Sequence, residues 1–368
     1  MTAMDELGHA VAPHACRNDR WSRTFALLLE RESALRVLRI ASQRSPHRLL
    51  GVLECDVVSE RSEKRRVLRY RVRAAGPGES PQFETWYAKQ YRGSNGARVA
   101  EVIRALEERK LADAAGPELV GYSQEHRLLV TREVEGSTLP ALLTHGSAEE
   151  LESILRQVGL AVAWIHTIEH RSLSQVLHTH GPAQEVEVLR LAYQRVEGGN
   201  LPRAVVRRLA DAGTSIEAEL LRRSSSRNGS AVDSVEGSRI GGGMLHRDLH
   251  PKQIVIQTGS TGFLDWDSAA MGERELDIGN LEAHIALLMA HQSAPAGSER
   301  PLLGAFRSGY LERGDFDESR LAAYRKAALL RLATLERLAQ PEVSTLDWPA
   351  LATALLERID VDAKVSTS

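Results

Sequence analysis

The segment that decides the fold runs from position 245 to position 267. It begins Leu245-His246-Arg247-Asp248-Leu249-His250-Pro251-Lys252-Gln253-Ile254-Val255-Ile256 and resumes with Gly262-Phe263-Leu264-Asp265-Trp266-Asp267. The two apolar runs predict short buried strands, and the polar residues between them predict a turn. A hairpin of this kind brings Gln253 and Asp265 together at its open end.

These residue types, in this order, suit phosphoryl transfer. The reaction needs a group that orients the acceptor hydroxyl and oxygen ligands that hold Mg²⁺ against the phosphates. His-Arg-Asp, then an amide side chain and a further Asp beyond a hairpin, is the arrangement of a protein kinase catalytic loop and metal site. We therefore predict Asp248 as the catalytic base, and Gln253 and Asp265 as magnesium ligands. We expect His246 to orient the catalytic loop through hydrogen bonds.

Two other interpretations stay open at this point. A His-x-Asp triplet is often structural when it stands alone. A metallohydrolase could instead use His246, Asp248 and His250 as ligands of a transition metal, but zinc sites need three or four ligands and an ordered second shell. The sequence has no other compact His cluster, which disfavours the metallohydrolase.

The segment resembles the aminoglycoside phosphotransferase and choline kinase-like family, the small-molecule branch of the kinase fold. Family members usually show His-Gly-Asp, four further residues, Asn, and then Ile-Asp-Trp or a similar strand. This chain has Arg247 for the Gly, as protein kinases do, and Gln253 for the Asn, as bacterial maltokinase-type members do. Gln carries the same carbonyl oxygen on a longer arm. The family also has an Asp that braces the catalytic loop. Asp277 matches it, although its place at a helix start equally suits a cap.

The resemblance implies an α+β, bilobal protein kinase-like fold from about Gly51 to about Leu338. A small antiparallel-sheet N-lobe would precede a mostly helical C-lobe. We expect residues 1–45 to be an N-terminal extension with an amphipathic helix, residues 46–135 a nucleotide-binding N-lobe, and residues 136–368 a C-lobe with the catalytic loop and the acceptor site. The chain of 368 residues, 42% of them hydrophobic, is long enough to build both cores.

A kinase fold also needs a strand Lys for the phosphates and a helix Glu to hold it. Lys89 lies inside the aromatic-rich strand predicted over residues 85–91, and Glu101 lies in the helix predicted over residues 98–106. We predict that they form this pair. Lys89 could instead be an edge-strand charge, and other Glu residues lie on the same helix.

Two further parts of the N-lobe follow from the same resemblance. The connection from Ser59 to Arg66, between two predicted strands, has no glycine, and its basic residues could meet phosphate as cations or form an ordinary solvated turn. The segment 127–139 resembles the interlobe connection, where main-chain groups near Arg132 and Val134 would bind the purine of ATP.

The remaining organisation is simple. Residues 1–19 are polar, an amphipathic pattern runs from Arg20 to about Gln43, and a capping box at Ser147 opens a helix that extends to His166. The stretch from Ser224 to Gly243 is rich in Ser, Gly and Arg and predicts a flexible loop. Helical periodicity returns from Leu321 to Leu338.

Composition limits the environment and the partners. A formal net charge of −2 argues against a nucleic-acid binder, and two cysteines in so long a chain suit a reducing cytosol. There is no run of eighteen apolar residues and no secretory segment at the N-terminus. We expect a cytoplasmic protein without a membrane partner, either a monomer or a homodimer.

The sequence therefore predicts an enzyme that uses ATP and Mg²⁺ to transfer the γ-phosphoryl group to a hydroxyl of a small molecule. The excess of acidic over basic residues after position 240 favours a cationic or polyhydroxyl acceptor, such as an aminoglycoside, a sugar or an amino alcohol. A protein kinase is disfavoured because no Ala-Pro-Glu-like segment follows Asp265. The alternative is a non-catalytic nucleotide-binding scaffold, or pseudokinase, of the same fold, suggested by the missing glycines and by Gln253.

Overall fold

The chain forms two compact units in a computed structural model that describes residues 20–61, 64–109, 113–168, 173, 175–196, 201–227, 242–335 and 346–365. The first unit comprises Met1–Arg104 and Pro117–Glu133, and the second comprises Ala105–Gly116 and Val134–Ser368. Helix α3 (Asn95–Arg109) begins in the first unit and ends in the second. Residues 1–19 and most of the predicted flexible loop before Gly243 lie outside the described residues.

The first unit is built on an antiparallel sheet with the strand order β1-β2-β3-β6-β5. The strands are β1 (Arg48–Arg61), β2 (Arg65–Ala75), β3 (Gln82–Tyr91), β5 (Leu119–Ser123) and β6 (Leu128–Arg132). Side chains alternate along β2, where Leu68, Tyr70 and Val72 are buried and the arginines between them are exposed. One face of this sheet therefore carries the core of the unit.

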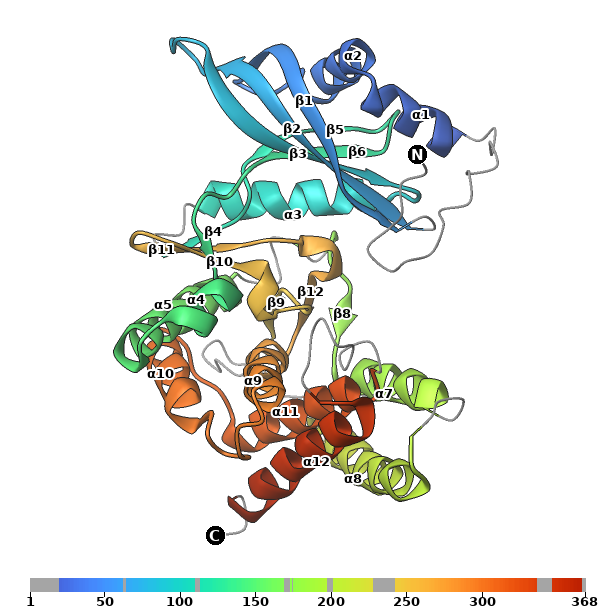
Figure 1. Cartoon of the computed structure of the whole chain (residues 1–368), viewed down its shortest axis with the longest axis vertical. Helices are drawn as coiled ribbons and strands as arrows, with labels where there is room; N and C mark the ends of the chain where they lie inside the picture. Colours follow the sequence, from blue (N-terminus) through green and yellow to red (C-terminus); the bar gives the residue numbers. More distant parts are fainter. Residues whose placement is uncertain are drawn as a thin grey trace. The chain divides into compact units, whose positions relative to one another are not determined.

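Helices α1 (Arg20–Leu29) and α2 (Arg31–Ala41) cover that face (Figure 1). Leu28 and Leu38 are fully buried in the same cluster as the strand residues, and the Tyr70 hydroxyl donates to the Leu28 carbonyl oxygen at 2.6 Å. The sequence predicted one helix here, but the helix stops at Glu30. The Glu30 side chain accepts hydrogen bonds from the backbone N–H groups of Glu32 and Ser33, and so caps a second helix.

The connection between β1 and β2 bears on one expectation. Arg66 belongs to β2 and is buried, with its guanidinium 4.2 Å from the centroid of the Phe25 ring and 5.0 Å from that of Trp21. It also pairs with Glu60 at 3.0 Å. Of the two interpretations left open for the basic residues of this connection, these contacts disfavour a contact with phosphate for Arg66. This side chain holds α1 against the sheet through stacking on aromatic rings.

The second unit contains two small sheets. One has the order β4-β11-β10-β7 and consists of β4 (Ala114–Ala115), β11 (Ser260–Phe263), β10 (Ile254–Gln257) and β7 (Ser137–Thr138). The other has the order β8-β12-β9 and consists of β8 (Thr179–His180), β12 (Ala270–Gly272) and β9 (Gly243–Leu245). The first of these includes the predicted hairpin, as β10 and β11.

Most of the second unit is helical. Its helices include α4 (Leu139–His145), α5 (Ala148–His166), α7 (Pro182–Val196), α8 (Arg203–Arg227), α9 (Glu275–His291), α10 (Arg300–Leu311), α11 (Glu318–Ala333) and α12 (Trp348–Val365). The predicted capping box is confirmed, since the Ser147 and Glu150 side chains each bond the other's backbone N–H group. A large apolar cluster joins α7, α8, α9, α11 and α12, whose ribbons are drawn in the lower part of Figure 1.

Two glycines let α5 and α10 approach closely. A Cβ atom on Gly159 would lie 2.0 Å from the Phe306 carbonyl oxygen, and one on Gly309 would lie 1.9 Å from that of Arg156. No larger residue fits at either position without separating the helices. Their contact fixes the end of α5, which reaches the site described below.

The architecture is α+β, with an antiparallel sheet in the first unit and a mainly helical second unit, as the sequence predicted. Within the described ranges, no helix is long and apolar enough to cross a membrane.

Candidate active site

The predicted hairpin brings Gln253 and Asp265 to the same end of the β10–β11 ladder. Ile254 pairs with Phe263 at the start of the ladder, and the Leu264 N–H donates to the Gln253 carbonyl oxygen at 2.9 Å. Gln253 also ends a short 3₁₀ turn, η1 (Pro251–Gln253), that connects the catalytic loop to β10. The open end of the hairpin therefore carries an amide and a carboxylate, as the sequence predicted, while their role as metal ligands stays a prediction.

His246 connects the catalytic loop to the Asp265 strand. Its Nε2 atom lies 2.7 Å from the Leu264 carbonyl oxygen and donates to it, because a carbonyl oxygen can only accept. Its ring lies 4.7 Å from that of Trp266, which is itself buried. This agrees with the expectation that His246 orients the loop.

Asp277 fixes the backbone of the catalytic loop. Its two carboxylate oxygens accept hydrogen bonds at 2.7 Å, one from the His246 N–H and one from the Arg247 N–H. Asp277 lies in the first turn of α9 and is almost completely buried. The bracing role predicted for this residue is confirmed.

A buried chain of hydrogen bonds supports this brace. His166, the last residue of α5, has its Nε2 atom 3.2 Å from an Asp277 carboxylate oxygen and its Nδ1 atom 2.8 Å from the Tyr310 hydroxyl on α10. With Nε2 protonated toward the carboxylate, Nδ1 accepts from Tyr310. Three helices thus converge on the carboxylate that positions the loop.

We expect Asp277→Ala to lower the free energy of unfolding by about 3 to 5 kcal/mol, because two buried N–H groups and the His166 ring would lose their acceptor. Denaturant titration measures the change. Asp315→Ala is the matched control, since the Asp315 side chain is exposed and should cost about 0.5 kcal/mol or less. Equal losses in the two variants would contradict the brace.

Two residues of the site have left-handed backbone conformations. Arg247 has φ of 68° and Asp265 has φ of 60°. Such a conformation costs a residue other than glycine roughly 1 to 2 kcal/mol, and strain of this kind concentrates at functional sites. In this chain the left-handed conformations turn the backbone at Arg247, before the hairpin, and at Asp265, after it.

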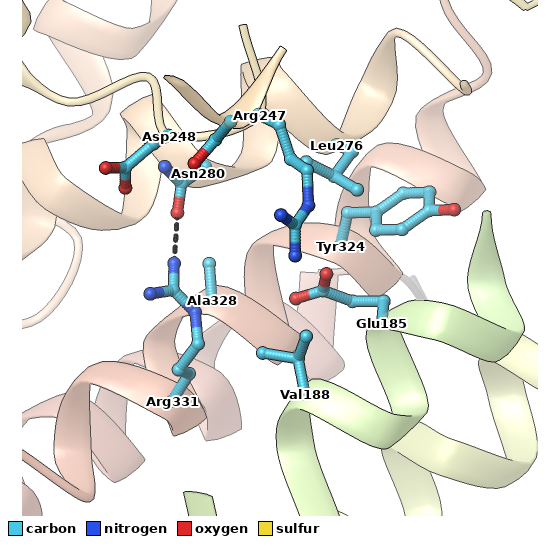
Figure 2. A pocket seen from close by; sticks show the side chains of 10 residues that line it. Glu185, Val188, Arg247, Asp248, Leu276, Asn280, Tyr324, Ala328 and Arg331 are labelled. Atoms are coloured by element: carbon cyan, nitrogen blue, oxygen red, sulfur yellow. Dashed lines mark hydrogen bonds between the residues drawn. The ribbon is translucent and has the colours of Figure 1, made fainter. Parts of the chain in front are cut away.

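Asp248 lines a cavity of about 170 Å³ in the second unit (Figure 2). Asn280 of α9 holds the next part of the loop, because its Nδ2 atom donates to the Leu249 carbonyl oxygen at 2.8 Å, and Arg331 of α11 donates to its Oδ1 atom. The wall is formed by three helices and by the loop itself, and includes Glu185, Val188, Arg247, Ser268, Leu276, Tyr324 and Ala328.

Charges inside this cavity affect one another. Burial by itself raises the pKa of Glu185, but the hydrogen bond with His180 at 3.0 Å and the positive charges of Arg331 and Arg247 hold that pKa below its ordinary value. Glu185 is therefore ionised at neutral pH. Outside the cavity lining, burial lowers the pKa of the His250 imidazole, against the opposing effect of the Asp248 carboxylate.

The residues predicted from the first unit are less closely connected. Lys89 lies on β3, with its ammonium 5.6 Å from the centroid of the Tyr91 ring. Glu101 lies on α3, is exposed, and pairs with Arg104 of the same helix. This contact does not favour Glu101 as the partner of Lys89, and the roles of both residues stay predictions.

The predicted purine-binding segment crosses from β6 into the second unit. The Arg132 N–H donates to the Glu118 carbonyl oxygen at 2.9 Å, and the Arg132 side chain pairs with Glu84 and Glu118. The Val134 side chain faces Gly262 of β11, where an added Cβ atom would lie 2.4 Å from it. Neither observation tests binding of a purine.

The metallohydrolase alternative gains no support. The Nε2 atom of His246 is engaged with the Leu264 carbonyl oxygen. Across the described ranges, no three His, Cys, Asp or Glu side chains are placed together to hold a metal ion.

Sequence reasoning missed several residues of the site. Asn280, Arg331, Glu185 and His166 lie on α9, α11, α7 and α5, far from the motif in the chain. Polar residues within the largely apolar segment that forms α9, Asn280 among them, were the signal that the sequence offered.

Comparisons with known proteins agree with this fold. A family model described as the phosphotransferase enzyme family matches residues 57–324. Spectinomycin phosphotransferase APH(9)-Ia, solved with ADP and spectinomycin, superposes with a TM-score of 0.55 at 11% identity over 91% of this chain and 99% of that one. The GDP and kanamycin complex of APH(2")-IIia gives 0.53 at 12% identity over 89% and 99%.

A choline/ethanolamine kinase family protein from Mesorhizobium loti gives a TM-score of 0.51 at 13% identity, over 90% of this chain and 94% of that one. At these identities the likeness concerns the fold. A search of curated proteins finds no match.

The fold and the braced catalytic loop define a kinase-like phosphotransferase. The family match spans well over half of the chain, so the chain belongs to the phosphotransferase enzyme family. It is accordingly an enzyme, a small-molecule kinase.

Proposed function

We propose that this enzyme transfers the γ-phosphoryl group of ATP, with Mg²⁺, to a hydroxyl group of a small molecule. The observation that carries the proposal is the placement of Asp248. It lines a cavity on a loop whose backbone is fixed by Asp277, by Asn280 and by His246, beside the Gln253 and Asp265 pair. A carboxylate held in this way can meet an acceptor without rearrangement.

Asp248 orients the acceptor hydroxyl and takes its proton. As the bond between the acceptor oxygen and the γ-phosphorus forms, the bond from that phosphorus to the β–γ bridging oxygen breaks, and ADP leaves. A half-buried carboxylate is well placed for this task because it is reachable from the cavity and fixed by its neighbours. His246 acts on the loop and does not exchange protons with the substrate.

Gln253 and Asp265 would hold Mg²⁺. An amide oxygen and a carboxylate are the hard oxygen ligands that this ion prefers, and the hairpin brings both residues to one end. When bound, the ion supplies positive charge that neutralises the phosphate oxygens. The left-handed conformation of Asp265 turns its side chain at the point where β11 ends.

The first unit would bind the nucleotide. We propose Lys89 for the phosphates, Glu101 as its partner, and main-chain groups near Arg132 and Val134 for the purine. The Arg132 N–H is already used in the sheet, so the purine contact falls to other main-chain groups of this segment. The similar structures include complexes with ADP and with GDP, which supports a nucleoside triphosphate as donor. A cytoplasmic location, as a monomer or a homodimer, completes the proposal.

An acceptor panel tests this function. Sugars, aminoglycosides and amino alcohols are offered with Mg-ATP or Mg-GTP, and release of the nucleoside diphosphate is measured. We expect at least one acceptor to raise that release well above the rate with water alone. An intact protein that binds Mg-ATP yet releases no ADP with any acceptor class would count against the proposal.

A further inference from the structure

Two arginines of the cavity beside Asp248 have Glu185 as their acidic neighbour, and neither forms a direct salt bridge with it. Arg247 extends from the catalytic loop and Arg331 from α11, and both side chains reach the same space in Figure 2. Among the residues that the structure describes, no carboxylate forms an ion pair with either guanidinium. The Nε atom of Arg247 is buried without a hydrogen-bond partner.

Other partly or fully buried arginines of this unit do form salt bridges. Arg307 pairs with Glu282 at 2.6 Å, Arg325 pairs with Glu299 at 2.9 Å, and Arg358 lies 3.6 Å from Glu299. A charge removed from water normally gains such a partner, because leaving it unpaired is costly. Two guanidinium groups that share the Glu185 carboxylate in a cavity, without a direct salt bridge to it, therefore indicate that a further anion binds there.

The cavity places these arginines close to the reacting group. Arg331 donates to Asn280, and Asn280 donates to the Leu249 carbonyl oxygen, directly after Asp248. Arg247 directly precedes Asp248 in the chain. A small molecule whose hydroxyl meets Asp248 thus has both arginines around it.

Glu185 compensates only part of this positive charge. Its carboxylate faces the Arg247 guanidinium in Figure 2, and it is also engaged by His180 at 3.0 Å. One structural carboxylate faces two guanidinium groups, each with five N–H donors in a planar fork that matches a carboxylate or a phosphate.

We propose that the acceptor carries an anionic oxygen group, a carboxylate or a phosphate, next to its reactive hydroxyl, and that Arg247 and Arg331 bind this group. The inference rests on the proposed function, because it assigns the acceptor of that reaction. It narrows the acceptor to hydroxy acids and hydroxy phosphates, which include sugar acids and sugar phosphates.

This local charge differs from the charge of the surrounding sequence. The acidic excess after position 240 favoured a cationic acceptor. Charges that touch the ligand dominate, however, because Coulomb energies fall with distance and distant surface charges are screened by salt.

The size of the cavity also favours a compact acceptor. Its volume of about 170 Å³ is below the roughly 300 to 1,000 Å³ of pockets that hold drug-sized ligands. A compact hydroxy acid suits this space better than a multi-ring antibiotic.

The test uses the full chain and four small probes that share a hydroxyl. Glycerate carries a carboxylate, glycerol 3-phosphate carries a phosphate, glycerol is neutral, and ethanolamine is cationic. Binding is measured by calorimetry in the presence of Mg-ADP, and ADP release is measured with Mg-ATP. We expect glycerate or glycerol 3-phosphate to bind at least about tenfold more tightly than the other two. The affinities of glycerate and glycerol 3-phosphate, compared with each other, show whether the anionic group is a carboxylate or a phosphate.

Two variants connect the preference to its residues. Arg247→Gly suits the left-handed backbone at this position, and Arg331→Gln keeps a donor for Asn280. Each variant should weaken binding of the anionic probe about tenfold to a hundredfold and leave the affinity for glycerol unchanged. Arg190→Gln is the control, because Arg190 lies on α7 but is exposed and pairs with Glu217.

The outcomes separate this inference from the proposed function. Anionic probes that bind no better than glycerol and ethanolamine overturn it, and so does an anion preference that survives in both variants. A cationic acceptor that releases ADP would overturn the inference and support phosphotransfer. A wild-type protein that does not bind Mg-ATP would instead refute the proposed function.

Discussion

Asp248→Asn is expected to lower turnover about a hundredfold or more while leaving the affinity for ATP within a few-fold of the wild-type value. The substitution preserves size and shape but removes the negative charge and most of the basicity. Asp248 lies between residues whose backbone groups are bonded to Asp277 and Asn280, so the loop should keep its conformation. The loss would therefore report on proton transfer and orientation of the acceptor.

The measurement needs steady-state kinetics with an identified acceptor and calorimetry with Mg-ATP. Asp211→Asn, on the exposed side of α8, is the matched control and should retain wild-type kinetics. A non-catalytic scaffold would tolerate Asp248→Asn in every assay. A variant with near wild-type kcat would show that Asp248 does not carry the chemistry.

The motif at residues 245–267 predicted most of the site in the second unit, because neighbouring residues in the sequence determine this part of the structure. The strands around the turn, and the Gln253 and Asp265 pair at their open end, follow from apolar runs separated by turn residues. Asp277 was identified through the resemblance to the family, while its place at a helix start equally suited a cap. Its two hydrogen bonds to the loop decide between the two roles that the sequence left open.

Other features depend on contacts that no local pattern encodes. Arg66 was one of the basic residues that could have met phosphate, but its guanidinium contacts the Trp21 and Phe25 rings because the N-terminal helices pack on the sheet. Glu185 and Arg331 reach the cavity from α7 and α11, which are far apart in the chain. Overall charge suggested the opposite sign from the one that these side chains create locally.

The last prediction concerns the metal. If Asp265 holds Mg²⁺, wild-type protein should bind ATP about tenfold or more tightly with Mg²⁺ than with EDTA, and Asp265→Ala should lose that difference. Asp211→Ala should keep it. Gln253 sharpens the test, because Gln253→Asn retains an amide oxygen and Gln253→Leu does not.

We therefore expect Gln253→Asn to keep part of the Mg²⁺ dependence and measurable activity, and Gln253→Leu to lose both. Unfolding of the variants would not by itself make Gln253→Leu less active than Gln253→Asn, since leucine suits the partly buried position at least as well as asparagine. Thermal unfolding of each variant checks the point. Equal behaviour of the two Gln253 variants would assign Gln253 to structure, and an unchanged Mg²⁺ effect in Asp265→Ala would place the metal elsewhere.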